Sequence, residues 1–159
     1  MRHSLPEGKN PAKGKIKRLK GNSVKTEKIR KKLISECDLL VSQLCRLQWD
    51  NKCGMCGRNG DNLAAHHFFG KKSHGSVRHD SRNLILLCFG CHIRRVHQEG
   101  DTEPAREAII KRIGAEEFEA VKWEAHQIRK FKVGDLEDIK LSLITARHDL
   151  VAQQAQELF

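Results

Sequence analysis

The sequence predicts an α+β fold in which a small zinc-stapled strand pair is flanked by an N-terminal helix and C-terminal helices. Two CxxC pairs, Cys53 with Cys56 and Cys88 with Cys91, enclose two short apolar segments, and segments with the apolar spacing of helices lie on both sides. At 159 residues the chain fits one such domain with appendages. We divide it into a disordered basic arm (1–25), a helix (26–49), a metal-binding core (50–100) and a helical region (101–159).

Local patterns predict the individual elements. Apolar residues at three- and four-residue spacing indicate a helix at 26–48, with Cys37 and Cys45 as small buried side chains on its apolar face and not as ligands. The segments 63–69 and 83–87 are typical of short strands. Further helices are expected from Cys91 and at 105–113, 116–126 and 136–156. The apolar sets of the last two include Trp123, Ile144 and Val151.

Positive charge is concentrated at the N-terminus. Of the net charge of +10, residues 1–32 contribute twelve Lys/Arg against two acidic residues, whereas residues 33–159 hold eighteen of each sign. Such a basic arm predicts sequence-independent contacts with DNA phosphates, although it could also be a solubilising tail. No apolar run is long enough to span a membrane and no secretory signal is evident, so we expect six reduced cysteines in the cytoplasm.

The four cysteines of the CxxC pairs predict a structural zinc site. Zinc prefers such a set of thiolates in a tetrahedron, with Zn–S distances of about 2.3 Å. Because Cys53, Cys56, Cys88 and Cys91 would fill all four positions, substrate could not reach this ion. Any catalysis must therefore occur elsewhere.

A second group of polar residues lies between and beside the cysteines. His66 and His67 are adjacent at the end of the first predicted strand, and Asn83 and His92 flank the second CxxC pair. Adjacent residues of a strand point to opposite faces. We therefore expect one of the two adjacent histidines to bind a metal and the other to face the scissile group.

These residues resemble a known family. His67 together with the string 83–92 is similar to the HNH endonucleases of the ββα-metal type with zinc knuckles, over about residues 53–97. A weaker similarity, carried by 31–49 and 105–114, is to phage recombination proteins of the NinG (Rap) type.

The HNH resemblance implies a role for each residue. His67 would be the general base, Asn83 would brace the loop and help to orient that base, and His66 and His92 would bind a divalent ion. This ion would hold the scissile phosphate and stabilise charge on the leaving 3′-oxygen. Imidazole ligands favour Mn²⁺, Ni²⁺ or Co²⁺ over Mg²⁺.

The third ligand of that ion stays open. In colicin-type nucleases it comes four residues after the equivalent of His92, where this chain has Val96, and His97 follows one residue later. On an α-helix that slip is about 100°. His97 could therefore bind only if the helix ends before it, and solvent is the alternative.

Together these features predict a metal-dependent DNA endonuclease, and the NinG likeness implies branched recombination intermediates of a phage in the bacterial host cytoplasm. Two alternatives remain, a non-catalytic zinc-ribbon DNA-binding protein and a nicking or packaging nuclease on linear duplex DNA. Cutting of both strands would favour a homodimer. The candidate phosphate contacts, which could also be mere surface charge, are Lys71, Lys72, Arg78, Arg82, Arg94 and Arg95.

Overall fold

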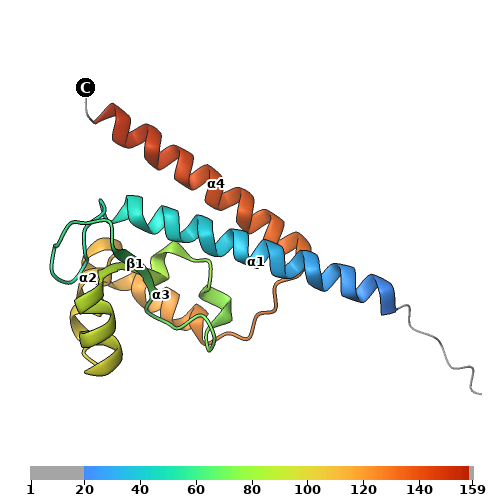
Figure 1. Ribbon diagram of the computed structural model, residues 1–159, viewed down its shortest axis with the longest axis horizontal. Coiled ribbons are helices and arrows are strands. Elements are labelled where there is room, and N and C mark those ends of the chain that lie inside the picture. The colour runs from blue at the N-terminus through green and yellow to red at the C-terminus, as the bar shows by residue number, and fades with distance from the viewer. Residues whose placement is uncertain (1–19, 158–159) are drawn as a thin grey trace, which may run out of the picture.

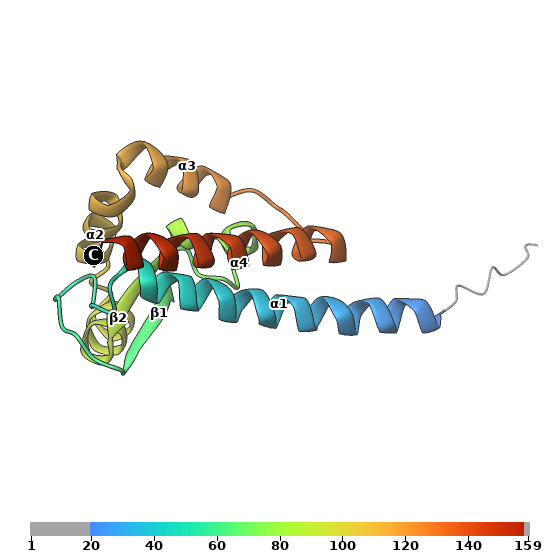
Figure 2. The ribbon, with the colours of Figure 1, turned by 90° about the horizontal axis from the view of Figure 1, so that it is seen from above.

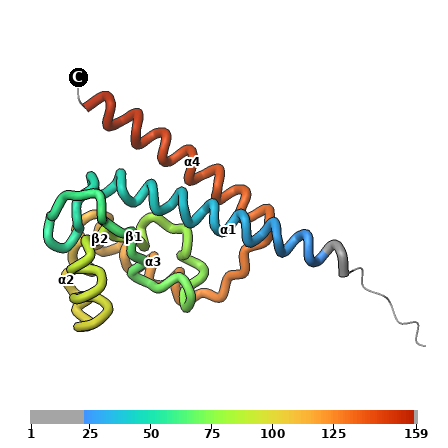
Figure 3. The backbone as a smooth tube through the Cα atoms, in the orientation of Figure 1, coloured from blue at the N-terminus to red at the C-terminus, as the bar shows by residue number. Residues whose placement is uncertain are grey.

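The computed structural model describes residues 20–157 and is α+β, as the sequence predicts (Figures 1 and 3). One long helix packs against a small two-stranded sheet and a second long helix packs on the first, while one shorter helix packs on the sheet and the other on that helix and on the short turns. In chain order the elements are α1 (Lys20–Gln48), β1 (Leu63–His67), the short turns η1 (Gly75–Val77) and η2 (Ser81–Asn83), β2 (Leu84–Cys88), η3 (Gly90–Gln98), α2 (Glu103–Ile113), α3 (Ala115–Ala125) and α4 (Val133–Gln156).

Helix α1 is the longest element and begins earlier than expected. It starts at Lys20, so residues 20–25 belong to the helix and not to the arm, while residues 1–19 of the predicted arm lie outside the described part. Its first turns extend beyond the rest of the molecule (Figures 1 and 2). Its C-terminal half buries Cys37 and Cys45 completely, which confirms their assignment as buried side chains.

Helices α1 and α4 run side by side in the same direction (Figure 2). Residue numbers rise in the same direction along the contacts between them: Lys140 Nζ lies 2.9 Å from Glu36 Oε2, and Arg147 Nη1 donates to Gln43 Oε1 over 2.8 Å. Leu136 and Leu143 are the buried residues on the apolar face of α4. None of the helices at residues 20–157 is long and apolar enough to cross a membrane.

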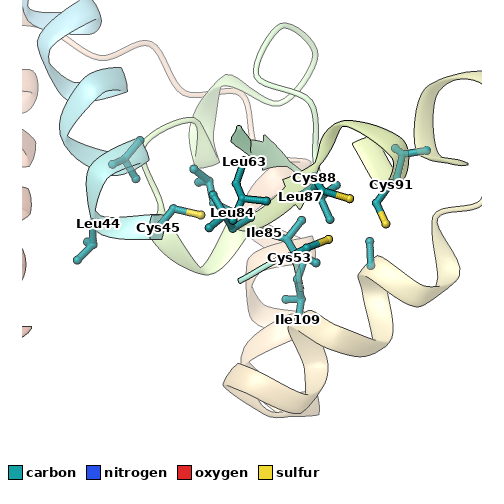
Figure 4. Close-up of a cluster of buried hydrophobic side chains, with 14 of the residues drawn as sticks. Leu44, Cys45, Cys53, Leu63, Leu84, Ile85, Leu87, Cys88, Cys91 and Ile109 are labelled. Carbon is teal, nitrogen blue, oxygen red and sulfur yellow. The ribbon is translucent and has the colours of Figure 1, made fainter. Parts of the chain in front are cut away.

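The strands β1 and β2 form an antiparallel hairpin whose register pairs Leu63 with Cys88 and His67 with Leu84. All five residues of β2 are buried, because α1 covers one face of the sheet and α2 the other. Leu84, Ile85 and Leu87 form the centre of the core, with Leu44 of α1 and Ile109 of α2 among the labelled neighbours in Figure 4. The hairpin is therefore a rigid platform for the residues at its ends.

Candidate metal centres and their pocket

The structure brings the four cysteines of the CxxC pairs together beside the end of β2. Their sulfur atoms all lie within 4.8 Å of one another, and Cys56 Sγ is 3.7 Å from Cys88 Sγ. Two sulfurs bound at about 2.3 Å to one tetrahedral zinc are separated by about 3.8 Å. The site, with Cys53, Cys88 and Cys91 buried and Cys56 at the surface, therefore fits a structural metal such as zinc.

Local backbone bonds shape the first cysteine pair. The Gly57 N–H donates to Cys53 O over 2.8 Å, and the Cys53 N–H donates to Arg58 O over 2.9 Å, closing a tight turn around Cys53–Cys56. Burial opposes ionisation of Cys88, but hydrogen bonds from Cys91 and the neighbouring thiols lower the pKa of Cys88 to about 7. One thiol is thus close to its metal-binding form at neutral pH.

Three histidines form a second cluster, separate from the cysteines. The ligating nitrogens of His66, His92 and His97 lie within 4.8 Å of one another. His92 Nε2 is 3.2 Å from His97 Nε2. Two nitrogens bound to one ion at about 2.1 Å are separated by about 3.0–3.4 Å, so the donor set fits a transition metal. A direct hydrogen bond between these two rings would give a similar distance.

The winding of η3 explains how His97 reaches this cluster. The element is a π-helix, with hydrogen bonds between residues five apart, and the Glu99 N–H continues the pattern by donating to Arg94 O over 2.9 Å. Residues five apart on an α-helix point about 140° away from each other. On a π-helix they lie about one turn apart on the same side, so His92 and His97 face the same point although the helix does not end before His97.

Burial keeps the imidazoles of His66 and His92 neutral. It lowers the pKa of His66 to about 4, with a smaller contribution from the neighbouring charges of His92 and His97. Burial likewise lowers the pKa of His92, followed by the effect of His97. Neutral imidazole is the form that binds metal, so His66 and His92 are in their metal-binding form at neutral pH.

His67 lies apart from the cluster of His66, His92 and His97, as the alternation of side chains along a strand predicts. Its Nε2 is 2.8 Å from the carbonyl oxygen of Arg78. Because a carbonyl can only accept, Nε2 must carry the proton, and Nδ1 keeps its lone pair. Burial lowers the pKa of His67, against the raising effect of this hydrogen bond, so the ring is neutral at pH 7.

Asn83 is almost completely buried and makes the bracing contacts expected of it. Its Oδ1 accepts from the Phe69 N–H over 2.8 Å, and its Nδ2 donates to Phe69 O over 3.0 Å and to Val77 O over 3.1 Å. The side chain thereby joins both ends of the loop at residues 70–77 to the start of β2. Its contribution to catalysis stays a prediction.

One pocket of about 390 Å³ is lined both by His67 and by the three clustered histidines. Lys71 from the loop and Asp38 and Ser42 from α1 line it as well. The two α1 residues were not predicted from the sequence. The only sequence signal for them is a pair of polar residues, four apart, beside the apolar face of that helix.

The six candidate phosphate contacts differ in how they are engaged within the chain. Arg78 binds Asp38, Arg95 binds Asp101, and Arg82 binds Asp80, Glu117 and Glu124, so the charge of each is offset locally. Arg94 is 71% exposed and lies 3.8 Å from a carboxylate oxygen of Glu99, and Lys71 lies 3.7 Å from Asp38. Lys72 is exposed, and no ion pair is found for it among the described residues. Lys71, Lys72 and Arg94 are therefore the better placed to meet a phosphate.

The fold and its two clusters define a small α+β protein with two sets of side chains that could hold a metal ion, one of cysteines and one of histidines. A family model described as Bacteriophage Lambda NinG protein matches residues 6–152 of the chain. The chain therefore belongs to the NinG family of phage recombination proteins, which confirms the weaker of the two likenesses. No curated protein and no solved structure matches it.

Proposed function

We propose that the protein is a metal-dependent DNA endonuclease that hydrolyses phosphodiester bonds through an HNH-type site. The observation that carries the proposal is the shared pocket, in which a neutral histidine with a free Nδ1 lies beside three histidines in metal-ligand geometry. Two antiparallel strands followed by a helix supply these residues, which is the element order of the ββα-metal type. The alternative of a non-catalytic zinc-ribbon protein gives no reason for such a pocket.

In the proposed reaction His67 is the general base. The Arg78 carbonyl fixes the tautomer of the ring, so that Nδ1 accepts a proton from the attacking water. Asn83 keeps the loop that carries this carbonyl in place. Because the ring is already neutral at pH 7, no proton has to leave it before the reaction.

His66, His92 and His97 would hold the divalent ion. When bound, this ion supplies electrostatic stabilisation for the scissile phosphate and the leaving 3′-oxygen. Nitrogen ligands favour Mn²⁺, Ni²⁺ or Co²⁺ over Mg²⁺, so activity should be highest with the transition metals. His97 would be the third ligand of this ion, for which the sequence allowed either His97 or solvent.

The substrate we propose is DNA in branched recombination intermediates, in the host cytoplasm, because the chain belongs to a phage recombination family. A polar face of α1 leads from its N-terminal end to the pocket, since its members recur every three or four residues: Lys28, Lys31, Ser35, Asp38 and Ser42. Both lysines are exposed and can contact phosphates along a duplex arm. Because these contacts are to phosphates and not to bases, the protein would select its DNA by shape and not by sequence.

The test is a cleavage panel of linear, nicked, single-stranded and four-way-junction DNA with Mn²⁺, Ni²⁺, Co²⁺ and Mg²⁺. We expect His67→Ala to abolish cleavage but to retain DNA binding, and His148→Ala, a histidine with an 83% exposed side chain, to cleave normally. Binding without cleavage by the unmodified protein would favour the zinc-ribbon alternative. Preference for linear duplex would favour a nicking or packaging nuclease, and retained cleavage by His67→Ala would refute the assignment of the base.

A further inference from the structure

A carboxylate of α1 binds the end of the loop between β1 and β2, at Arg78 and His79. Arg78 Nε and Nη2 donate to the two oxygens of Asp38 over 2.9 and 2.6 Å, and His79 Nε2 lies 3.1 Å from Asp38 Oδ1. Lys71 Nζ is a weaker partner at 3.7 Å. Asp38 thus binds two successive residues of a segment that is 40 positions away in the chain.

The end of the loop at residues 77–80 gains most from such an external contact, because the backbone hydrogen bonds there are long. The Val77 N–H lies 3.4 Å from His74 O, the Arg78 N–H 3.3 Å from Gly75 O, and the Asp80 N–H 3.3 Å from Val77 O. N–H···O bonds in well-ordered secondary structure are usually about 2.9–3.0 Å. The side chain of Asn83 binds the loop as far as Val77, and Asp38 binds the next two residues.

Arg78 connects this ion pair to the base. Its guanidinium is held by Asp38, and its carbonyl oxygen accepts the proton of His67 Nε2. Because side chain and carbonyl belong to one residue, fixing the two-pronged guanidinium restricts where the carbonyl can point.

We propose that Asp38 is a positioning residue for His67, acting through Arg78 to keep the ring in the tautomer that leaves Nδ1 free. The proposal rests on the proposed function for the catalytic role of His67. It assigns part of the proposed active site to a helix that precedes the cysteine-bearing core, outside the segment that resembles HNH enzymes.

The charge of Asp38 is the property to remove. Although burial opposes its ionisation, hydrogen bonds from Arg78 and His79 hold the pKa of Asp38 well below its usual range, so the group is a carboxylate at neutral pH. Asp38→Asn keeps the shape and removes the charge. Glu36→Gln is the matched control, because Glu36 lies on the same helix in an interhelical ion pair with Lys140 but does not touch the loop.

The kinetic test measures kcat and KM for DNA cleavage in Asp38→Asn, Glu36→Gln and Asp38→Asn combined with His67→Ala. We expect Asp38→Asn to lower kcat by about 10–100-fold, the usual effect of losing a residue that orients a functional group, with KM changed little. Glu36→Gln should cleave as the unmodified protein does. The combined variant should be no less active than His67→Ala alone, because both changes remove the same function.

A second arm reads the tautomer without cleavage, by long-range ¹H–¹⁵N correlation of the His67 ring, assigned by its absence from His67→Ala. The unmodified protein and Glu36→Gln should show one tautomer protonated at Nε2, and Asp38→Asn a mixture. Unchanged kcat and tautomer in Asp38→Asn, or an equal loss in Glu36→Gln, would overturn the proposal. If the unmodified protein cleaves no DNA, the nuclease assignment fails, while the ring spectrum still decides whether Asp38 positions His67.

Discussion

The first CxxC turn depends on a glycine that has no room for a side chain. A Cβ added to Gly54 would lie 2.7 Å from Ile85 Cγ1 and 2.7 Å from Trp49 Cζ3, about 1 Å closer than an ordinary carbon–carbon contact. Ile85 is completely buried, and the Trp49 ring donates to Leu84 O over 3.2 Å and stacks under the Arg112 guanidinium. Neither neighbour can move away easily, so in Gly54→Ala the turn itself must shift from the sheet.

The cost of that shift follows from the contacts it disturbs. Overpacking a closed core costs about 1–3 kcal/mol, and the 2.8 Å bond from the Gly54 N–H to Leu86 O contributes about 1 kcal/mol more. We expect a loss of about 2–4 kcal/mol in the free energy of unfolding. For a chain of this size that lowers Tm by roughly 4–16 °C.

The assay is thermal unfolding of the zinc-loaded protein together with the rate of zinc transfer to a chromogenic chelator. Gly54→Ala should melt earlier and release zinc faster, because two of the four thiolates lie on the displaced turn. Gly134→Ala is the control: no atom lies within 4 Å of its added Cβ, and in helix α4 the change should stabilise by about 0.5–1 kcal/mol. A Gly54→Ala protein that melts and holds zinc like the unmodified chain would refute the packing of this turn on Ile85 and Trp49.

Three further predictions concern the metal cluster, the ion pair and the arm. His97→Ala should weaken Mn²⁺ or Ni²⁺ binding at least ~10-fold by calorimetry without changing zinc content, and equal affinity would contradict its role as a ligand. Asp38→Asn should cost about 2 kcal/mol of unfolding free energy at pH 7. Because the folded-state pKa of Asp38 is lowered, this difference should be fully present above about pH 4 and disappear as acid protonates Asp38 below that; a difference independent of pH would contradict it. Deleting residues 1–22, with seven Lys/Arg, should flatten the salt dependence of DNA binding, and an unchanged slope would exclude the arm as a DNA contact.

Ligand chemistry made the central part of the molecule predictable. Cysteine spacing predicted the cysteine cluster because zinc needs two short, tight turns that face each other, and the apolar run 83–87 predicted the strand between them, observed at Leu84–Cys88. The apolar face of the predicted helix separated Cys37 and Cys45, which are buried in the hydrophobic core and join no ligand cluster among the described residues. The match with the NinG family agrees with the likeness of the flanking helices.

The winding of one helix could not be read from the sequence. A hydrogen-bond pattern of five residues in η3 leaves no mark on an apolar spacing over nine residues, so the α-helical assumption made His97 look misplaced. Helix faces were also predicted too wide. Trp123, Ile144 and Val151 belong to the apolar sets of their helices, yet they are 67%, 44% and 48% exposed, since spacing gives the direction of a face and not the width of what packs on it.

The predicted thiolate site also determines where the histidines lie. In an antiparallel hairpin a slip of one residue turns every side chain to the other face. Here Leu63 pairs with Cys88, so a metal bound by Cys88 and the first CxxC turn would fix the register that places His66 and His67 at the far end of β1. Cys91 is followed directly by His92, so the same metal would also hold the first turn of η3. A metal at the four cysteines would thereby position the three histidines, and a chain without this structural metal would lose the geometry of both clusters.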